Sequence, residues 1–144
     1  MTDPIQTAQD RFAQGFNCSQ AVFSAYAPQL GIDAETALKL ASPFGGGVAR
    51  HGQVCGAVTG ALMALGLKSG TATLETKDEA YKTAEVFIQR FEELHGTIVC
   101  RELLGYDLSK PDELQTAREQ GVFTSACPVF VNNAAELVAE ILGE

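Results

Sequence analysis

Residues 54–67 read VCGAVTGALMALGL, and this stretch decides the expected fold. Only Thr59 interrupts its apolar character. The segment is too short to span a bilayer, but it has the length of a buried core helix. Because a helix that is apolar all round needs neighbours on several sides, we expect a central helix over about residues 53–67.

Small residues recur every four positions in this stretch, at Gly56, Gly60 and Ala64. Each glycine inside a helix costs about 1 kcal/mol relative to alanine. We therefore expect a compensating contact, in which the backbone of another helix approaches this smooth strip closely.

The rest of the chain shows helical periodicity and no clear alternation of period two. This pattern predicts an all-α protein, a compact multi-helix bundle that forms a single helical domain over residues 1–144. Helix start and stop signals divide it further. The expected helices run from Pro4 to about Gln14, from the cap Asn17 to Pro28, from the cap Asp33 to Pro43, through a stripe of Ala80, Tyr81, Ala84, Phe87, Ile88, Phe91 and Leu94 that ends at Gly96, from the cap Thr97 to Leu104, from Pro111 to Gln120, and onward from the cap Ser125.

The composition is that of a globular protein, with 46% hydrophobic and 19% charged residues among 144. Ten basic residues stand against 18 acidic ones, which gives a net charge of −8. So acidic a surface repels phosphate backbones and anionic lipids, which disfavours nucleic acid and membrane surfaces as partners. The N-terminus has no basic segment followed by an apolar run, so we expect a cytoplasmic protein without direct membrane insertion.

Four cysteines fall in the first turns of expected helices, and none forms a CxxC pair. They are Cys18, Cys55, Cys100 and Cys127. Free amides and the helix dipole favour thiolate over thiol at such positions, and thiolate is both nucleophile and metal ligand. All four are therefore candidates for one catalytic or metal-binding site, and Cys55 is expected to titrate below a free thiol. The alternative is that each is a small buried apolar side chain.

Other polar groups lie near Cys55. His51, four residues earlier, is a candidate catalytic residue that could take a proton from a thiol, although it also suits a solvated loop. Arg50 and Arg101 are interpreted as surface residues that could instead stabilise a thiolate or bind an anion.

The glycine-rich stretch before the central helix makes Gly46, Gly47 and Gly56 candidates for cofactor binding. Backbone amides at such a helix start could bind a phosphate. The stretch lacks both the preceding strand and the Lys-Ser or Lys-Thr of known phosphate loops. Tight packing beside the cysteines is the other interpretation.

Together these residues resemble a known family. Cys18, FGGG at 44–47, VCGAVTG at 54–60, Cys100 within CRELLG at 100–105, and Cys127 are similar to the C_GCAxxG_C_C family. The resemblance implies a redox role without an established reaction. It also implies a membrane transporter as a candidate partner, since relatives tend to be encoded near transporter genes.

Three functions stay open at this point. The first is thiol/disulfide exchange, as a thiol/disulfide oxidoreductase acting on a redox partner protein or a small-molecule oxidant or reductant; four cysteines allow three pairings. The second is an electron-transfer module in which the four cysteines hold an iron–sulfur cluster or a metal ion. The third is a structural helical partner of a transporter, with inert cysteines. Both redox functions require the sulfurs to lie close together.

Overall fold

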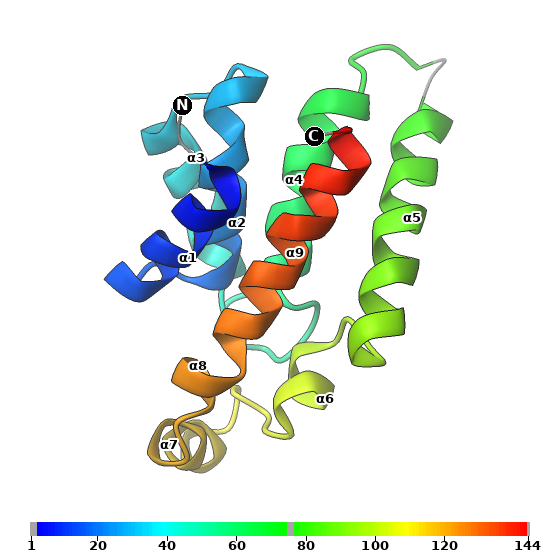
Figure 1. Ribbon diagram of the computed structural model, residues 1–144. Helices are drawn as coiled ribbons and strands as arrows, with labels where there is room; N and C mark the ends of the chain where they lie inside the picture. The colour runs from blue at the N-terminus through cyan, green and yellow to red at the C-terminus, as the bar shows by residue number, and fades with distance from the viewer. Residues whose placement is uncertain (1–2, 75–76, 144) are drawn as a thin grey trace.

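A computed structural model describes residues 3–74 and 77–143 of the chain and confirms the all-α prediction. Figure 1 shows α1–α3 on one side, α4 and α9 in the middle, α5 on the other side and α6–α8 at the lower end. The elements are α1 (Pro4–Gln14), α2 (Cys18–Tyr26), the 3-10 helix η1 (Ala27–Leu30), α3 (Ala34–Ala41), the 3-10 helix η2 (Ser42–Phe44), α4 (Gly56–Ser69), α5 (Lys77–His95), α6 (Cys100–Leu104), α7 (Pro111–Glu119), α8 (Val122–Ser125) and α9 (Cys127–Leu142).

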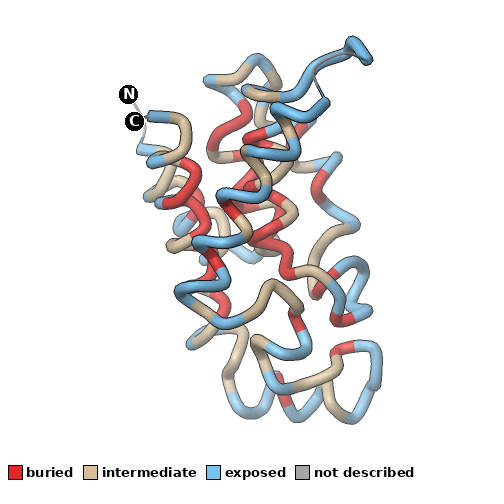
Figure 2. Tube along the Cα trace, turned by 90° about the vertical axis from the view of Figure 1, so that its right-hand side faces the viewer, coloured by how far each residue is buried: buried red, intermediate tan, exposed pale blue. Residues whose placement is uncertain are grey.

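Helix α4 is the expected central helix, and it contacts α2, α5 and α9. Its Ala57, Val58, Ala61 and Ala64 are completely buried. Figure 2 shows the buried residues gathered along the inward sides of the helices, with exposed residues outside. The helix begins at Gly56 rather than near residue 53, because the preceding residues pair with a distant segment described below.

The small residues of α4 face the start of α2, as predicted. A Cβ placed on Gly60 would lie 2.6 Å from the carbonyl oxygen of Ser19, and one on Gly56 would lie 3.0 Å from the Ser19 amide nitrogen. The hydroxyl of Thr59 donates a hydrogen bond of 3.1 Å to the Ser19 hydroxyl. Only glycine lets the two backbones approach this closely.

Most local signals at the helix ends operate as expected. Asp3 and Asp33 accept hydrogen bonds from the first-turn amides of α1 and α3. Asn17 and Gln20 form a reciprocal capping box at the start of α2. This box fixes the first turn that carries Cys18.

Two predicted caps are wrong. The N-cap of α6 is Val99, and the hydroxyl of Thr97 instead accepts a hydrogen bond from the Val99 amide. The hydroxyl of Ser125 donates to the carbonyl of Gly121, which makes it part of the short helix α8 rather than the cap of α9. The bridge residue Val99 takes the cap position of α6, and Ala126, which directly follows α8, takes the cap position of α9.

The predicted apolar stripe of α5 is too wide. Phe87 and Phe91 are completely buried, but Tyr81 and Leu94 are 68% and 57% exposed. Because α5 packs mainly against α4 and α9, a narrow stripe is enough to hold it.

The segment Val122–Leu142 is long and apolar enough to cross a membrane, judged by length and composition alone. In this structure it forms α8 and α9, and α9 packs against α1, α4 and α5. Val131, Ala134 and Val138 of α9 have no exposed surface.

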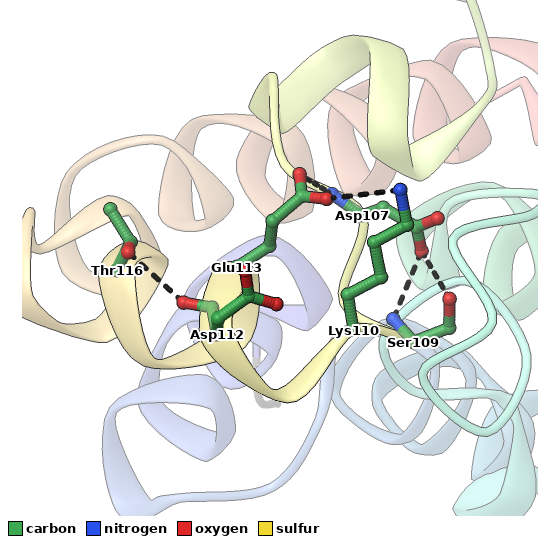
Figure 3. A network of polar contacts seen from close by, with 6 residues as sticks. All are labelled: Asp107, Ser109, Lys110, Asp112, Glu113 and Thr116. Carbon is green, nitrogen blue, oxygen red and sulfur yellow. Dashed lines mark hydrogen bonds and ion pairs between the residues drawn. The ribbon is translucent and has the colours of Figure 1, made fainter.

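A second, smaller core lies below the bundle, where Cys100, Leu108 and Ala117 are buried together. A polar network fixes the entry to α7 beside it (Figure 3). The Asp107 amide donates to the Glu113 carboxylate at 2.9 Å, and Asp107 itself accepts from the amide of Ser109 at 3.0 Å. The network therefore fixes the loop that leads from α6 into α7.

Candidate functional site

All four cysteines lie at helix starts, as predicted. Cys18, Cys100 and Cys127 are the first residues of α2, α6 and α9, and Cys55 is the N-cap of α4. All four line one cavity of about 1200 Å³. The helices α4 and α9 begin at the lower end of the bundle, next to α6–α8 (Figure 1). The fold thus brings the four cysteines, which lie far apart in the sequence, to the lining of the same cavity.

Cys18 and Cys127 form a hydrogen-bonded pair. The Cys18 thiol donates to the Cys127 sulfur, and this bond together with burial raises the pKa of Cys18 well above its ordinary value. The same bond lowers the pKa of Cys127, because it stabilises the thiolate by more than burial disfavours it. Within this pair Cys127 is the more acidic thiol and Cys18 the less acidic one.

Cys55 and Cys100 are brought together by a short antiparallel bridge in which Val54 lies opposite Val99. The amide of Cys55 donates to the Ile98 carbonyl at 2.7 Å, and the amide of Cys100 donates to the Gln53 carbonyl at 2.6 Å. The two cysteines are therefore diagonal neighbours on the same face of the bridge. Such residues have Cα atoms about 7–8 Å apart, whereas a disulfide needs about 4.4–6.8 Å.

Burial controls the acidity of this second pair. It raises the pKa of Cys55 to about 11, although the amides of Ala57 and Val58 act in the opposite direction. Burial and the neighbouring Cys55 raise the pKa of Cys100 to about 12. The expectation that Cys55 is the acidic thiol is therefore wrong, because the helix start lies inside the apolar core, where desolvation outweighs the backbone amides.

A left-handed turn precedes α4. Gly46, Gly47, Val48, Ala49 and Arg50 all have positive φ, between 49° and 71°. For a residue other than glycine this conformation costs roughly 1–2 kcal/mol. Several backbone hydrogen bonds hold the turn, among them Ala49 N to Pro43 O at 2.8 Å and Arg50 N to Gly45 O at 3.0 Å.

The candidate cofactor-binding glycines line the cavity, where they make room for neighbouring side chains. A Cβ on Gly47 would lie 2.6 Å from the Cβ of Cys100, and one on Gly56 would lie 3.1 Å from the Cβ of Cys18. A Cβ on Gly46 would lie 2.8 Å from the Cγ of Arg50. These contacts favour the interpretation that the glycines allow tight packing beside the cysteines.

The structure does not bring His51 into the cavity. Its side chain is exposed, and its Nδ1 lies 3.2 Å from the carbonyl oxygen of Ala49. Two arginines border the cavity instead, Arg50 from the left-handed turn and Arg118 from α7. The sequence contains no signal for Arg118, because its place beside the cysteines depends on how α7 packs.

The cysteine sulfurs are also the donor atoms that the metal alternative requires. Within residues 3–74 and 77–143, no group of three or more His, Cys, Asp or Glu side chains is arranged to hold a metal ion. The cysteines do not fit a single-ion site, and their contacts divide them into a hydrogen-bonded pair and a bridge-linked pair.

Residues 16–141 match the family model described as "Putative redox-active protein (C_GCAxxG_C_C)". The chain belongs to this family. The C_GCAxxG_C_C match contains all four cysteines, the glycine-rich turn and α4. No curated protein and no solved structure matches the chain.

Proposed function

We propose that the protein carries out thiol/disulfide exchange, with Cys127 and Cys18 as the redox pair. The observation that supports this most directly is their hydrogen bond within the cavity. Thiolate is the reactive form of cysteine, and Cys127 is the cysteine whose pKa this contact lowers. The family description, which names a redox-active protein, supports the same class of chemistry.

The proposed reaction reduces a disulfide substrate. The Cys127 thiolate attacks one substrate sulfur, the substrate S–S bond breaks, and the other substrate sulfur leaves as a thiolate. Cys18 then gives its proton to that thiolate and attacks the Cys127 sulfur, which forms the Cys18–Cys127 disulfide and expels the second substrate sulfur as a thiolate. Two electrons pass from the cysteine pair to the substrate, and the reverse reaction oxidises a dithiol.

The test is equilibration of the protein with mixtures of reduced and oxidised glutathione, followed by acid quenching, alkylation and peptide mass mapping. We expect a reversible Cys18–Cys127 disulfide, which Cys18→Ser and Cys127→Ser each abolish. Cys55→Ser and Cys100→Ser are matched controls that should retain it. A reversible disulfide confined to Cys55 and Cys100, or none at all, would contradict the proposal.

A kinetic measurement tests the role of the hydrogen bond. At neutral pH, iodoacetamide should alkylate Cys127 faster than the other cysteines. Cys18→Ala removes the donor, so the pKa of Cys127 should rise and its alkylation should slow. Equal rates in the two proteins would show that the hydrogen bond does not activate Cys127.

The iron–sulfur and structural alternatives remain predictions with their own signatures. Anaerobic purification of a brown protein with equal amounts of iron and sulfide would replace the proposal with the cluster function. A colourless protein without any reversible disulfide would leave the structural role.

A further inference from the structure

The cavity that contains the cysteines has an unusual charge pattern for this chain. The protein has 18 acidic residues and a net charge of −8. None of the acidic residues described by the structure lines the cavity, and its charged lining residues are Arg50 and Arg118. In the described part of the chain neither arginine forms an ion pair.

The rest of the lining is largely apolar. Aromatic and leucine side chains come from α1, α6, α7, α8 and α9, and they include Phe12, Leu103, Leu104, Leu114, Phe123 and Phe130. The volume of about 1200 Å³ exceeds the roughly 300–1,000 Å³ of typical small-molecule sites, so the cavity has room for a ligand of that class. An apolar cavity bordered by cations suits a molecule with an apolar body and an acidic group.

The backbone of Arg50 is held in a strained conformation. Its own φ is 65°, within the left-handed turn. The absence of a side chain on Gly46 leaves room for the Arg50 stem, since a Cβ there would lie 2.8 Å from Arg50 Cγ. Strained backbone of this kind clusters at ligand sites, because strain persists only where the surrounding structure fixes it.

We propose that this cavity binds an amphipathic organic anion, with Arg50 and Arg118 as the cations that attract its acidic group and the phenylalanine and leucine side chains as the contact for its apolar body. The inference rests on the proposed function in one respect: such a ligand would occupy the cavity that Cys127 lines and would be the substrate or a competitor of substrate. A guanidinium binds carboxylates and phosphates through paired hydrogen bonds, so both head groups belong to this class.

The experiment measures binding to the reduced full-length protein by isothermal titration calorimetry, below the micelle concentration of each probe. Decanoate and decyl phosphate are the two anionic probes, and they distinguish a carboxylate from a phosphate ligand. Decanol keeps the apolar body without the charge, and acetate keeps the charge without the body. We expect saturable binding of at least one anionic probe and none of decanol or acetate.

Charge variants then test the arginines. Arg50→Gln and Arg118→Gln should each weaken binding of the anionic probe by about tenfold. Arg101→Gln is the matched control, because this exposed arginine follows Cys100 directly but does not line the cavity. Phe123→Ala should also weaken binding of the anionic probe, because it removes part of the apolar contact, and decanol should still not bind. Circular dichroism checks that each variant keeps its helical content.

The outcomes separate this inference from the proposed function. Binding is also measured in the Cys18→Ser/Cys127→Ser double variant, which has no redox pair. Anion binding in this variant supports the inference even where the wild type forms no disulfide. Absence of anion binding to the folded wild type, or equal weakening by Arg101→Gln and Arg50→Gln, would overturn the inference even where the disulfide forms normally.

Discussion

At the scale of single residues, the pKa values of the cysteines depend more on burial and on hydrogen bonds between thiols than on their position at a helix start. All four cysteines lie at helix starts, yet only Cys127 has a lowered pKa. Cys55 is 4% exposed, and desolvation dominates there. Among the four cysteines, the pKa is therefore lowered where a neighbouring thiol donates a hydrogen bond, at Cys127.

The raised pKa of Cys55 predicts a loss of stability in alkaline solution. Its ordinary value is 9.0 and its value in the folded protein is about 11. Above pH 9 the unfolded chain has released this proton while the folded chain still holds it, so the free energy of unfolding falls as pH rises. The effect is absent below pH 9 and amounts to about 3 kcal/mol once pH exceeds 11.

Urea unfolding of reduced protein at several pH values, with Cys55→Ala as the comparison, measures this effect. The variant should lose less stability than the wild type between pH 9 and pH 11, because other alkaline titrations are common to both. Parallel curves for the two proteins would show that Cys55 is not desolvated in the folded state.

At the scale of elements, the contact between α4 and α2 predicts opposite effects for two glycines of one helix. Gly60→Ala places a Cβ 2.6 Å from the Ser19 carbonyl oxygen and should cost about 1–3 kcal/mol through overpacking. Gly66 has open space around it, so Gly66→Ala should stabilise the protein by up to about 1 kcal/mol. Chemical denaturation distinguishes the two, and a similar change in both would refute the close approach of α2.

The left-handed turn predicts that replacing Ala49 with glycine does not destabilise the protein. Ala49→Gly relieves roughly 1–2 kcal/mol of backbone strain and loses about 0.5–1 kcal/mol through the greater entropy of the unfolded chain. The variant should be as stable as the wild type or slightly more stable. Ala84→Gly, in the right-handed helix α5, is the control and should lose about 1 kcal/mol. A thermal melt in which both lose the same amount would refute the strain.

Sequence reasoning succeeded where the signal was local. Asn17 and Gly15 mark real helix ends, and the recurring Gly56 and Gly60 indicated a close helix contact that the structure contains. It failed where distant segments meet. The Val54–Val99 bridge joins residues far apart in the chain. Because of this bridge, α4 begins at Gly56 rather than near residue 53, and Cys55 is buried.

At the scale of the whole molecule, the fold rests on an apolar core formed mainly by α2, α4, α5 and α9. Tyr26, Phe87 and Phe91 are among its largest completely buried side chains. The Tyr26 hydroxyl donates to the carbonyl of Ala135 at 2.6 Å, which links α2 to α9. This core does not depend on bonds between the cysteines.

The protein should therefore fold without metal. Dialysis against a chelator should leave the helical circular dichroism and the cooperative melt unchanged, in contrast to a zinc finger, whose folding energy comes from the ion. Loss of helix after chelation, restored by adding metal back, would contradict this expectation.

The Val54–Val99 bridge also couples the hydrogen exchange of two backbone amides. The amides of Cys55 and Cys100 donate to opposite segments of the same bridge, so separating α6 from the start of α4 exposes both at once. In deuterated water the exchange of the two amides would therefore report the same free energy of opening. The same opening exposes the sulfurs of Cys55 and Cys100. The rate at which reagents reach these two cysteines would therefore depend on how often this local opening occurs.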